Sequence, residues 1–287
     1  KVMRDMGLVT FDEPVKRLLT QGMVVGETFF DDETGKRVYH QPDKVTTTRD
    51  AKGKITGAVS NDGKMLKYAI ERMSKSKGNG VDPDEMVEIY GADAARLFVM
   101  FAAPIENELV WNEAGIEGAV RFLQRVWRLV YRWQSAVGNG PDRTQAASLP
   151  ETAASGKLRQ KTHQTIKRIG DSFDTLQFNT PVAALMELCN AIYDAGEPEN
   201  ATNADIDAVR EAITSLTLML TPFAPHTAEE LYSVIAGSDA GMLANGVLFP
   251  EYNEELAKAD EIEIPVQING KLRSRVMASP ETANDQL

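Results

Sequence analysis

Hydrophobic positions recur at helical spacing through most of the chain between residues 82 and 237. In residues 113–134 the apolar side chains follow one another every three or four positions, the pattern of a helix with one buried face. They are Ile116, Val120, Leu123, Val126, Trp127 and Val130. The spacing returns in residues 152–170, 179–196 and 205–220, and a short helix is expected after Pro225. Adjacent amphipathic helices bury their apolar faces against each other, so the pattern predicts a helix bundle.

Helix start and stop signals support this division. "DPDEM" offers Asp82 as a cap, Pro83 at the first helical position and Glu85 three residues on, and Gly91 then ends that short helix. "DAARLFVMFAAP" predicts a second, very apolar helix that ends near residue 104. Asn112 is a cap candidate for the long helix that follows.

Two segments show strand patterns instead. Residues 26–69 hold short β-branched or aromatic pieces between the turn sequences "DDETGK", "DAKGK" and "SNDGK", which predicts a small β-rich module. A long, poorly ordered loop is the alternative.

Residues 261–278 alternate apolar and polar around Asn269–Gly270, the strongest short hairpin signal. A hairpin needs more surface to be stable, so we expect it to begin a small α/β domain. Residues 1–25 predict helix ends that lead into a short strand.

Composition limits the class of protein. The chain has 287 residues, of which 43% are hydrophobic and 25% charged, as in folded proteins of about two domains. It contains neither an apolar run of membrane-spanning length nor a secretory signal. Cys189 is the only cysteine, which excludes an intramolecular disulfide and a multi-cysteine zinc site and fits a cytoplasmic protein. Because the chain starts at Lys1, we expect a fragment of a longer protein; a processed mature protein is the alternative.

Net charge alone argues against nucleic-acid binding, but the distribution of charge does not. The formal net charge is −11, whereas phosphate is bound by Lys and Arg. Basic residues nevertheless gather on two predicted helices, where either a solvated helix face or an RNA phosphate contact would explain them. They are Arg121, Arg125, Arg128 and Arg132 on the first helix and Arg159, Lys161, Lys167 and Arg168 on the second.

Isolated aromatic and histidine residues are weaker candidates for a binding site. Trp127 falls on the apolar stripe and is expected in the core, with base stacking as the alternative, while Trp111 beside the helix start is open. His226 is expected to pack in the bundle at a helix start. It has no partner at metal-ligand spacing, and we expect no metal site.

The run "RMSKSKGN", residues 72–79, is the strongest candidate for chemistry. Lys75 can approach a phosphate as a compact point charge, and Ser74 and Ser76 can donate hydrogen bonds to it. The run is not a Walker loop, because it lacks the G-x-x-x-x-G-K-[ST] pattern. A mobile lysine loop suits a charge that develops transiently, as when pyrophosphate leaves a nucleotide.

This run resembles the Lys-Met-Ser-Lys-Ser signature of class I aminoacyl-tRNA synthetases, with Arg72 in the first position. Residues 74–104 and 112–130 are similar to the passages that follow the signature in the Leu, Ile and Val enzymes. The insert before the signature and "VQINGKLRSRV" resemble the leucyl enzymes of bacterial type. The resemblance implies ATP, with Mg, bound by residues 72–77, and Lys75 acting on its phosphates. The residues of that expected ATP site are Arg72, Met73, Ser74, Lys75, Ser76 and Lys77.

The resemblance also implies a domain order and partners. The fold class is then mixed and mainly α. The parts are the end of a Rossmann-type catalytic domain (1–25), a leucine-specific insert (26–69), the signature loop with connecting helices (70–103), an anticodon-binding-type bundle (104–237), a linker (238–260) and the start of a truncated C-terminal tRNA-binding domain (261–287). The partners would be leucine, ATP and tRNA(Leu), bound by a monomer in the cytoplasm without a membrane. On the hairpin, Lys271 and Arg273 join the expected tRNA contacts, beside Arg275 on the same face.

The resemblance leaves alternatives. The family's His-Ile-Gly-His signature is absent, and His40, His163 and His226 are isolated, so the chain alone is expected to be inactive. A valyl, isoleucyl or methionyl enzyme would lack the insert at this place. A non-catalytic RNA-binding helical module would belong to a gene without the missing half. A helical scaffold with a chance lysine loop would bind no RNA.

Overall fold

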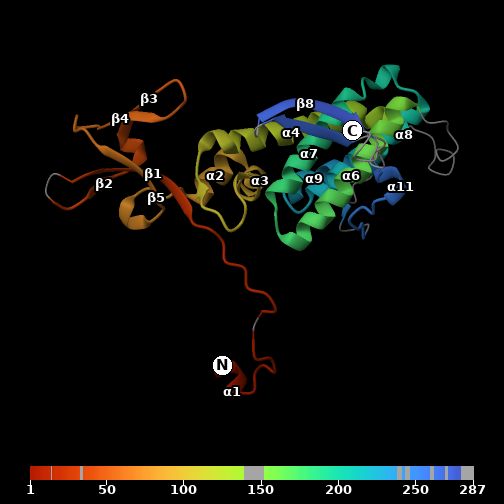
Figure 1. Cartoon of the computed structure of the whole chain (residues 1–287). Helices are drawn as coiled ribbons and strands as arrows, with labels where there is room; N and C mark the ends of the chain where they lie inside the picture. The colour runs from red at the N-terminus through yellow and green to blue at the C-terminus, as the bar shows by residue number, and fades with distance from the viewer. Residues whose placement is uncertain are drawn as a thin grey trace. The chain divides into compact units, whose positions relative to one another are not determined.

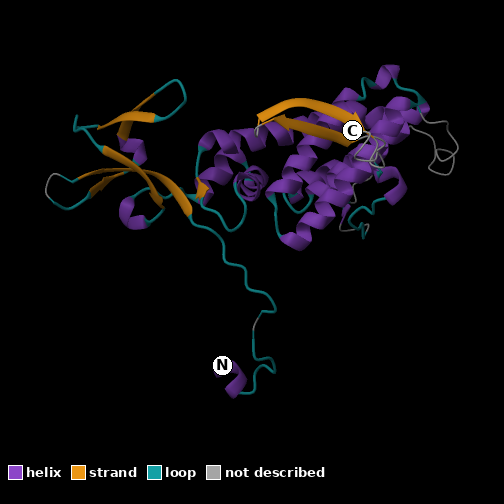
Figure 2. Cartoon of the chain, viewed as in Figure 1, coloured by secondary structure: helices purple, strands orange, loops and turns teal. Residues whose placement is uncertain are grey.

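The chain divides into two compact units, each described here by itself. The computed structural model describes residues 1–13, 15–32, 35–138, 152–237, 241–242, 246–258, 262–268 and 271–278. Unit 1 contains Lys1–Gly80 and Ala103–Trp111, and unit 2 contains Val81–Ala102 and Asn112–Leu287. Strands dominate unit 1 and helices dominate unit 2 (Figures 1 and 2). The mainly helical mixed fold expected from the sequence is confirmed, and residues 26–69 hold the short strands that their pattern predicts.

Unit 1 is organised around strand β1 (Val24–Asp31). β1 pairs antiparallel with β2 (Val38–His40) and with β5 (Lys67–Arg72). It also pairs in parallel with β6 (Leu109–Val110), which the chain reaches only after an excursion into unit 2. The hairpin of β3 (Val45–Arg49) and β4 (Ile55–Ser60) is a separate two-stranded sheet. The remaining elements of unit 1 are α1 (Val2–Asp5), η1 (Pro42–Lys44) and η2 (Lys75–Lys77).

The core of unit 1 is small and comes from residues that face inward from β1, β4 and the turn before β5. Phe29, Ile55, Ala58 and Leu66 are buried together, with Val45 and Tyr68 packed against them. The predicted turns are built from side-chain caps. Asp50 Oδ1 accepts hydrogen bonds from the backbone N–H groups of Lys52 and Lys54, both at 2.9 Å, and Gly53 takes φ +79°. That left-handed conformation favours glycine, which explains the "GK" of the turn sequence.

Unit 2 is a bundle of helices, and all but the last of them, a four-residue helix at 254–257, were predicted from the sequence. They are α2 (Pro83–Tyr90), α3 (Ala92–Ala102), α4 (Glu113–Gly138), α6 (Ala153–Thr175), α7 (Asn179–Asp194), α8 (Asn203–Leu220), α9 (Pro225–Ala236) and α11 (Glu254–Ala257), with the 3-10 turn η3 (Pro198–Asn200). Their stripes meet in one core, where Val126, Leu185 and Leu216 are fully buried. The expected packing of neighbouring helices is therefore present.

The apolar stripe of α4 differs from the predicted one at its tryptophans. Trp127 is 37% exposed, whereas Trp133 is fully buried. Trp133 lies seven positions after Val126, two helical turns on, and therefore on the same face. Trp127 is one position off that face and lies at the edge of the buried stripe, where part of its side chain is exposed. The expectation that Trp127 is a core residue is wrong.

Both caps predicted for helices of unit 2, Asp82 and Asn112, are present, whereas α7 and α9 start without a side-chain cap from the preceding residue. Asp82 Oδ1 accepts from the backbone of Asp84 at 3.0 Å, and Asn112 Oδ1 accepts from Gly115 at 2.7 Å. Helix α9 has no cap from its own preceding residue. Asp93 of α3 replaces it by accepting from the backbone N–H and the hydroxyl of Thr227, at 2.6 and 2.7 Å.

Histidine 226 does not pack in the bundle as expected. It is the second residue of α9, its side chain is 81% exposed, and its Nδ1 lies 2.9 Å from Asp93 Oδ1. It lies at the helix start, where its side chain points toward solvent. Burial of the Asp93 carboxylate raises its pKa, but the hydrogen bonds from Thr227 and then His226 outweigh burial, so the net pKa lies below the ordinary value.

The predicted hairpin forms near the end of the chain. β7 (Ile262–Ile268) pairs antiparallel with β8 (Lys271–Ala278), and the Asn269–Gly270 turn lies outside the described residues. Among the helices in the described ranges, none is both long enough and apolar enough to cross a membrane.

Candidate functional site

Residues 72–79, named here the lysine loop, leave strand β5 and remain attached to unit 1. Arg72 is the last residue of β5 and is exposed. The backbone N–H of Met73 donates to Val24 O of β1 at 3.1 Å. Lys75–Lys77 form the single 3-10 turn η2, and Gly78 ends it at φ +64°. The loop is thus a compact turn at the end of the sheet.

Asn79 joins the beginning of the lysine loop to β1. It is only 3% exposed. Its Oδ1 accepts from the backbone N–H of Ser74 at 2.9 Å, and its Nδ2 donates to Thr28 Oγ1 at 2.7 Å. Nδ2 also lies 3.3 Å from Arg72 O. One buried side chain therefore fixes the turn against the central strand.

Gly26 allows the other close approach between the lysine loop and β1. A Cβ atom at Gly26 would lie 2.9 Å from Met73 Cε, so the side chain of Met73 occupies the space that a larger residue would need. The methionine of the signature is consequently a packing residue in this structure.

The two lysines of the loop have different surroundings. Lys77 Nζ lies 2.6 Å from Glu71 Oε2 and 6.0 Å above the ring of Tyr39. Glu71 also accepts from Arg37 Nη1 at 2.7 Å. The hydrogen bond from Lys77, followed by that from Arg37, holds the pKa of Glu71 below its ordinary value despite partial burial. Lys77 is therefore engaged within unit 1.

Lys75 is exposed, and within the described ranges it makes no ion pair. The hydroxyl oxygens of Ser74 and Ser76 lie beside it, 3.3 Å apart. An exposed ammonium and two hydroxyl donors can bind the oxygens of a phosphate. The turn that carries them is held against β1 by Met73 and Asn79. The structure separates the two lysines, because Lys77 is paired with Glu71 whereas Lys75, the lysine singled out from the sequence, is exposed.

Sequence reasoning missed Asn79, Glu71 and Thr28. Asn79 is the last residue of the run "RMSKSKGN", and Glu71 directly precedes the run, so both residues were close to the candidate site in the sequence. A Gly, Ser and Asn composition is typical of a flexible loop, whereas burial of Asn79 depends on strand β1, more than 40 residues earlier. Nothing in the local pattern indicates that contact.

A second group of candidates forms the arginine stripe: Arg121, Arg125, Arg128 and Arg132 of α4. The guanidinium groups of Arg125 and Arg132 lie 5.2 and 5.7 Å from the ring centroid of Tyr193 on α7. With Arg128 they line an open hollow of about 550 Å³. Arg132 also pairs with Glu197. Arg128 is exposed and makes no ion pair with any residue that the structure describes.

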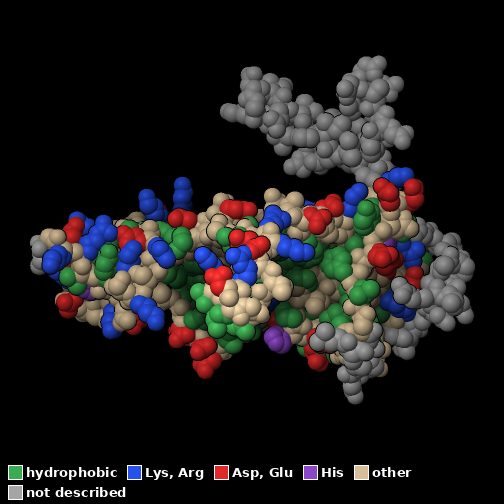
Figure 3. Space-filling model, turned by 90° about the horizontal axis from the view of Figure 1, so that it is seen from below, with side chains coloured by type: hydrophobic (Ala, Val, Ile, Leu, Met, Phe, Trp, Pro, Cys, Tyr) green, Lys and Arg blue, Asp and Glu red, His purple; other side chains and the backbone are tan. Residues whose placement is uncertain are grey.

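The basic residues of α6 are largely paired. Lys161 Nζ lies 2.7 Å and Arg168 Nη1 3.2 Å from Glu187 on α7. Lys167 Nζ lies 5.4 Å over the ring of Tyr252. Lys161 and Arg168 remain partly exposed but share the one carboxylate of Glu187. Figure 3 shows Lys and Arg interspersed with Asp and Glu on the drawn face, so any basic surface is local.

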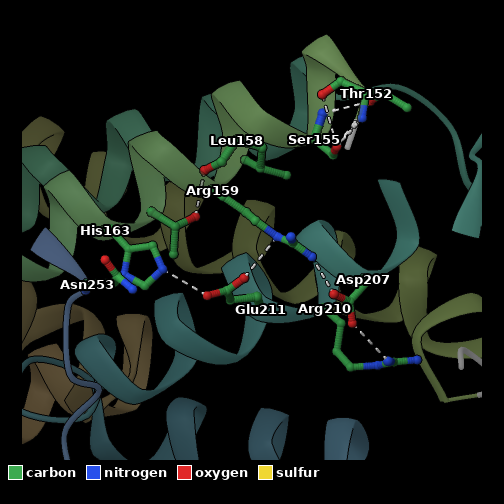
Figure 4. A network of polar contacts seen from close by, with 10 residues as sticks. Thr152, Ser155, Leu158, Arg159, His163, Asp207, Arg210, Glu211 and Asn253 are labelled. Carbon is green, nitrogen blue, oxygen red and sulfur yellow. Dashed lines mark hydrogen bonds and ion pairs between the residues drawn. The ribbon is translucent and has the colours of Figure 1, made fainter. Parts of the chain in front are cut away.

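Arg159 belongs to the interior instead. Its side chain is 17% exposed and pairs with Asp207 and with Glu211 Oε2, the latter at 3.3 Å (Figure 4). His163 Nε2 lies 3.0 Å from Glu211 Oε1, and His163 Nδ1 accepts from the backbone N–H of Asn253 at 3.0 Å. This network ties the segment before α11 to helices α6 and α8. Arg159 is a packing residue rather than an open phosphate contact.

The hairpin candidates lie next to each other on β8. Lys271 is its first residue, and the side chain of Arg273 is exposed. Within the described ranges no group of three or more His, Cys, Asp or Glu is arranged to hold a metal ion.

Two protein families match parts of the chain. Residues 60–112 match the family described as tRNA synthetases class I (I, L, M and V), and residues 156–286 match the anticodon-binding domain of tRNA ligase. The first match contains the lysine loop, and the second contains most of the bundle and the hairpin.

Curated relatives match the chain over its whole length. The leucine–tRNA ligase of Erwinia tasmaniensis is 43% identical over 100% of this chain, and that of Acinetobacter baumannii is 42% identical over 100%. The leucine–tRNA ligase of Laribacter hongkongensis is 44% identical over 99%. The chain covers 32–33% of these relatives, so it spans about a third of their length.

Solved structures show the same fold. A ternary complex described as LeuRS-tRNA-LeuAMS, from Agrobacterium radiobacter, matches 99% of this chain and 30% of its own chain with a TM-score of 0.64 at 25% identity. A Mycobacterium tuberculosis methionyl-tRNA synthetase in complex with methionyl-adenylate matches 62% of this chain and 38% of its own, with a TM-score of 0.50 at 19% identity. The second likeness concerns the fold alone.

Proposed function

The chain belongs to the leucine–tRNA ligase family of class I tRNA synthetases, and we propose that it carries the ATP-phosphate loop and a tRNA-binding bundle of such a ligase. The reaction activates leucine with ATP, releases pyrophosphate and transfers the leucyl group to tRNA(Leu). This activity is that of a protein as long as the relatives, of which the chain spans about a third. Residues 1–287 alone are expected not to form the adenylate, because they lack a His-Ile-Gly-His signature.

Lys75 is the residue proposed to act in the chemical step. As leucine attacks the α-phosphate, negative charge grows on the departing pyrophosphate, and a positioned ammonium stabilises that charge. Lys75 is the exposed lysine of the loop, with the Ser74 and Ser76 hydroxyls beside it. Mg²⁺ would arrive with the nucleotide and neutralise part of its charge.

The other residues of the proposed ATP site shape the loop. Met73 packs at Gly26, and Arg72 stands exposed where β5 ends. Lys77, paired with Glu71, would hold the turn rather than meet the phosphate first. Because Glu71 also pairs with Arg37, the β-rich insert and the lysine loop share one carboxylate. The insert therefore helps to set the position of the loop.

We assign tRNA(Leu) to the basic surfaces of unit 2. The arginine stripe is the best supported, since Arg128 is exposed and Arg125 and Arg132 line one hollow with Tyr193. RNA helices are gripped mainly through shape and backbone, which suits such a stripe. The further proposed contacts are Lys161, Lys167, Arg168, Lys271 and Arg273.

The domain order expected from the sequence belongs to the same proposal. Its parts are the catalytic-domain end (1–25), the insert (26–69), the loop and connecting helices (70–103), the bundle (104–237), the linker (238–260) and the C-terminal domain start (261–287). A cytoplasmic monomer fits a chain whose single cysteine is a buried, free thiol.

The test uses the full-length ligase that contains this chain and measures leucine-dependent ATP–pyrophosphate exchange. We expect Lys75→Ala to lower the rate by roughly 10²–10³-fold, as removal of one transition-state donor does elsewhere. Lys67→Ala is the matched control, because Lys67 is an exposed lysine of unit 1 paired with Asp32. An unchanged rate in Lys75→Ala would refute the phosphate role. Exchange with valine or isoleucine but not leucine would overturn the leucine assignment.

A further inference from the structure

Helix α4 exposes a stacked aromatic pair on its solvent side. Trp127 and Tyr131 lie one turn apart, with ring centroids 5.2 Å apart and an angle of 23° between the rings. Their exposed fractions are 37% and 43%. The other large aromatic residues of this helix, Phe122 and Trp133, are buried. Two neighbouring aromatic side chains thus remain partly exposed on a helix that buries its others.

The pair lies beside a hollow with both apolar and polar walls. The hollow measures about 310 Å³ and is lined by Leu123, Gln124, Trp127, Arg128 and Thr227. Its volume is at the lower end of small-ligand sites, about 300–1,000 Å³. It offers the face of an indole, a side-chain amide and a guanidinium. Gln124 and Arg128 are exposed, and Arg128 makes no ion pair with the described residues.

The charge that α4 contributes beside the hollow favours an anionic ligand. Residues 118–138 of α4 contain four arginines and no Asp or Glu. Arg128 belongs to the arginine stripe and also lines the hollow, so the cationic surface and the aromatic surface are continuous. A polyanion with flat apolar groups complements both. Duplex RNA hides the faces of its bases within the stack, so only an unpaired nucleotide can use an exposed indole.

We propose that Trp127, Gln124 and Arg128 bind one unpaired nucleotide of an RNA. The base stacks on the Trp127 ring, whose other neighbour is Tyr131, and the amide of Gln124 hydrogen-bonds the base edge. The guanidinium of Arg128 meets the phosphate. Stacking on aromatic side chains is the usual way in which proteins hold splayed bases. This inference rests on the proposed function, because it requires the arginine stripe to meet RNA.

The experiment compares two RNA hairpins that differ in one nucleotide. One hairpin is fully paired, and the other carries a single bulged 2-aminopurine. We expect the bulged hairpin to bind the wild-type chain more tightly, with quenching of 2-aminopurine fluorescence. Trp127→Ala is expected to weaken its binding roughly tenfold, within the range measured for one stacked base, and to abolish the quenching. Its affinity for the paired hairpin should stay within about twofold.

Three control variants separate the roles. Arg128→Ala should weaken binding of both hairpins and reduce the salt dependence of binding, as loss of a phosphate contact does. Trp127→Phe should keep part of the stacking and of the quenching. Phe101→Ala removes another exposed aromatic side chain, on α3, and should change neither.

The possible failures are distinct. If the wild-type chain binds neither hairpin, the proposed RNA surface itself is wrong and the nucleotide site falls with it. If both hairpins bind equally well, without quenching, the RNA surface stands and the nucleotide site is wrong. If Trp127→Ala weakens the binding of both hairpins equally, Trp127 supports the folded structure and does not contact the bulged base. That result would also overturn the site.

Discussion

Replacing Asn79 by Ala should loosen the lysine loop without changing its charge. The buried amide makes two well-formed hydrogen bonds, one from the Ser74 N–H at 2.9 Å and one to Thr28 Oγ1 at 2.7 Å. Each is worth about 1 kcal/mol net, and a buried donor left unsatisfied costs about 1–3 kcal/mol. The free energy of loop opening should therefore fall by about 2–4 kcal/mol, so that the loop opens roughly 30- to 900-fold more often.

Hydrogen exchange measures this change directly. The backbone amides of Met73 and Ser74 are bonded to Val24 O and to Asn79 Oδ1, so both report loop opening. We expect faster exchange at these two amides in Asn79→Ala, in line with the estimate above. Asn61→Ala is the matched control, since Asn61 is an exposed asparagine of the same unit.

Catalysis provides the second readout. In the full-length ligase, Asn79→Ala should lower leucine-dependent pyrophosphate exchange, but less than Lys75→Ala does, because the ammonium remains and only its position is loosened. Unchanged exchange of the Met73 and Ser74 amides would refute the reasoning, whatever the activity. It would mean that the backbone contacts to β1 hold the loop without Asn79.

Three further changes test the helical unit. Arg159→Ala should destabilise the chain to urea by roughly 2–3 kcal/mol, because it removes the charged contacts to Asp207 and Glu211 and leaves Asp207, among the described residues, only the 3.5 Å contact to Arg210, while RNA binding by the folded chain stays unchanged. Weaker RNA binding at equal folding would contradict the interior role. Asp93→Asn should lower stability by about 1–2 kcal/mol at pH 7. Since the pKa of Asp93 is depressed in the folded chain, the wild-type advantage should persist above the unfolded value near pH 4 and disappear as pH falls through the folded pKa. An advantage that did not shrink in acid would show that the charge is irrelevant. Burial raises the pKa of the Cys189 thiol to about 11, so a thiol reagent at pH 8 should react only after unfolding. The absorbance of a chromogenic thiol reagent would measure this reaction.

Local patterns in the sequence predicted the elements correctly where neighbouring residues decide the structure. The 3.6-residue spacing identified α4 and α8, and Ile116, Val126 and Ile213 are buried as that spacing requires. Asp82 and Asn112 cap the helices that follow them. The Asn269–Gly270 signal placed a hairpin between β7 and β8. The caps and the hairpin depend on contacts within a few residues, and the helical spacing identifies the face that will be buried, so local sequence is enough to predict them.

Contacts between distant segments could not be predicted in this way. Strand β6 completes the sheet of unit 1 only because residues 109–110 return to β1. Asp93 caps α9 from a position more than 130 residues earlier. In the sequence Arg159 is one of four basic candidates on its helix. In the structure it pairs with Asp207 and Glu211 of α8, and its side chain is largely buried.

The sequence by itself determined most helices and strands in their order, though not β6, as well as the run of residues in the lysine loop and the arginine periodicity of α4. Only the tertiary structure decided which lysine stays open, since Glu71 occupies Lys77 and leaves Lys75 exposed. It also decided that Trp133 enters the core and Trp127 does not. The physical reason is the same in each case. Periodicity and capping act within one or two helical turns, whereas burial and ion pairing depend on which distant side chain fills the remaining space.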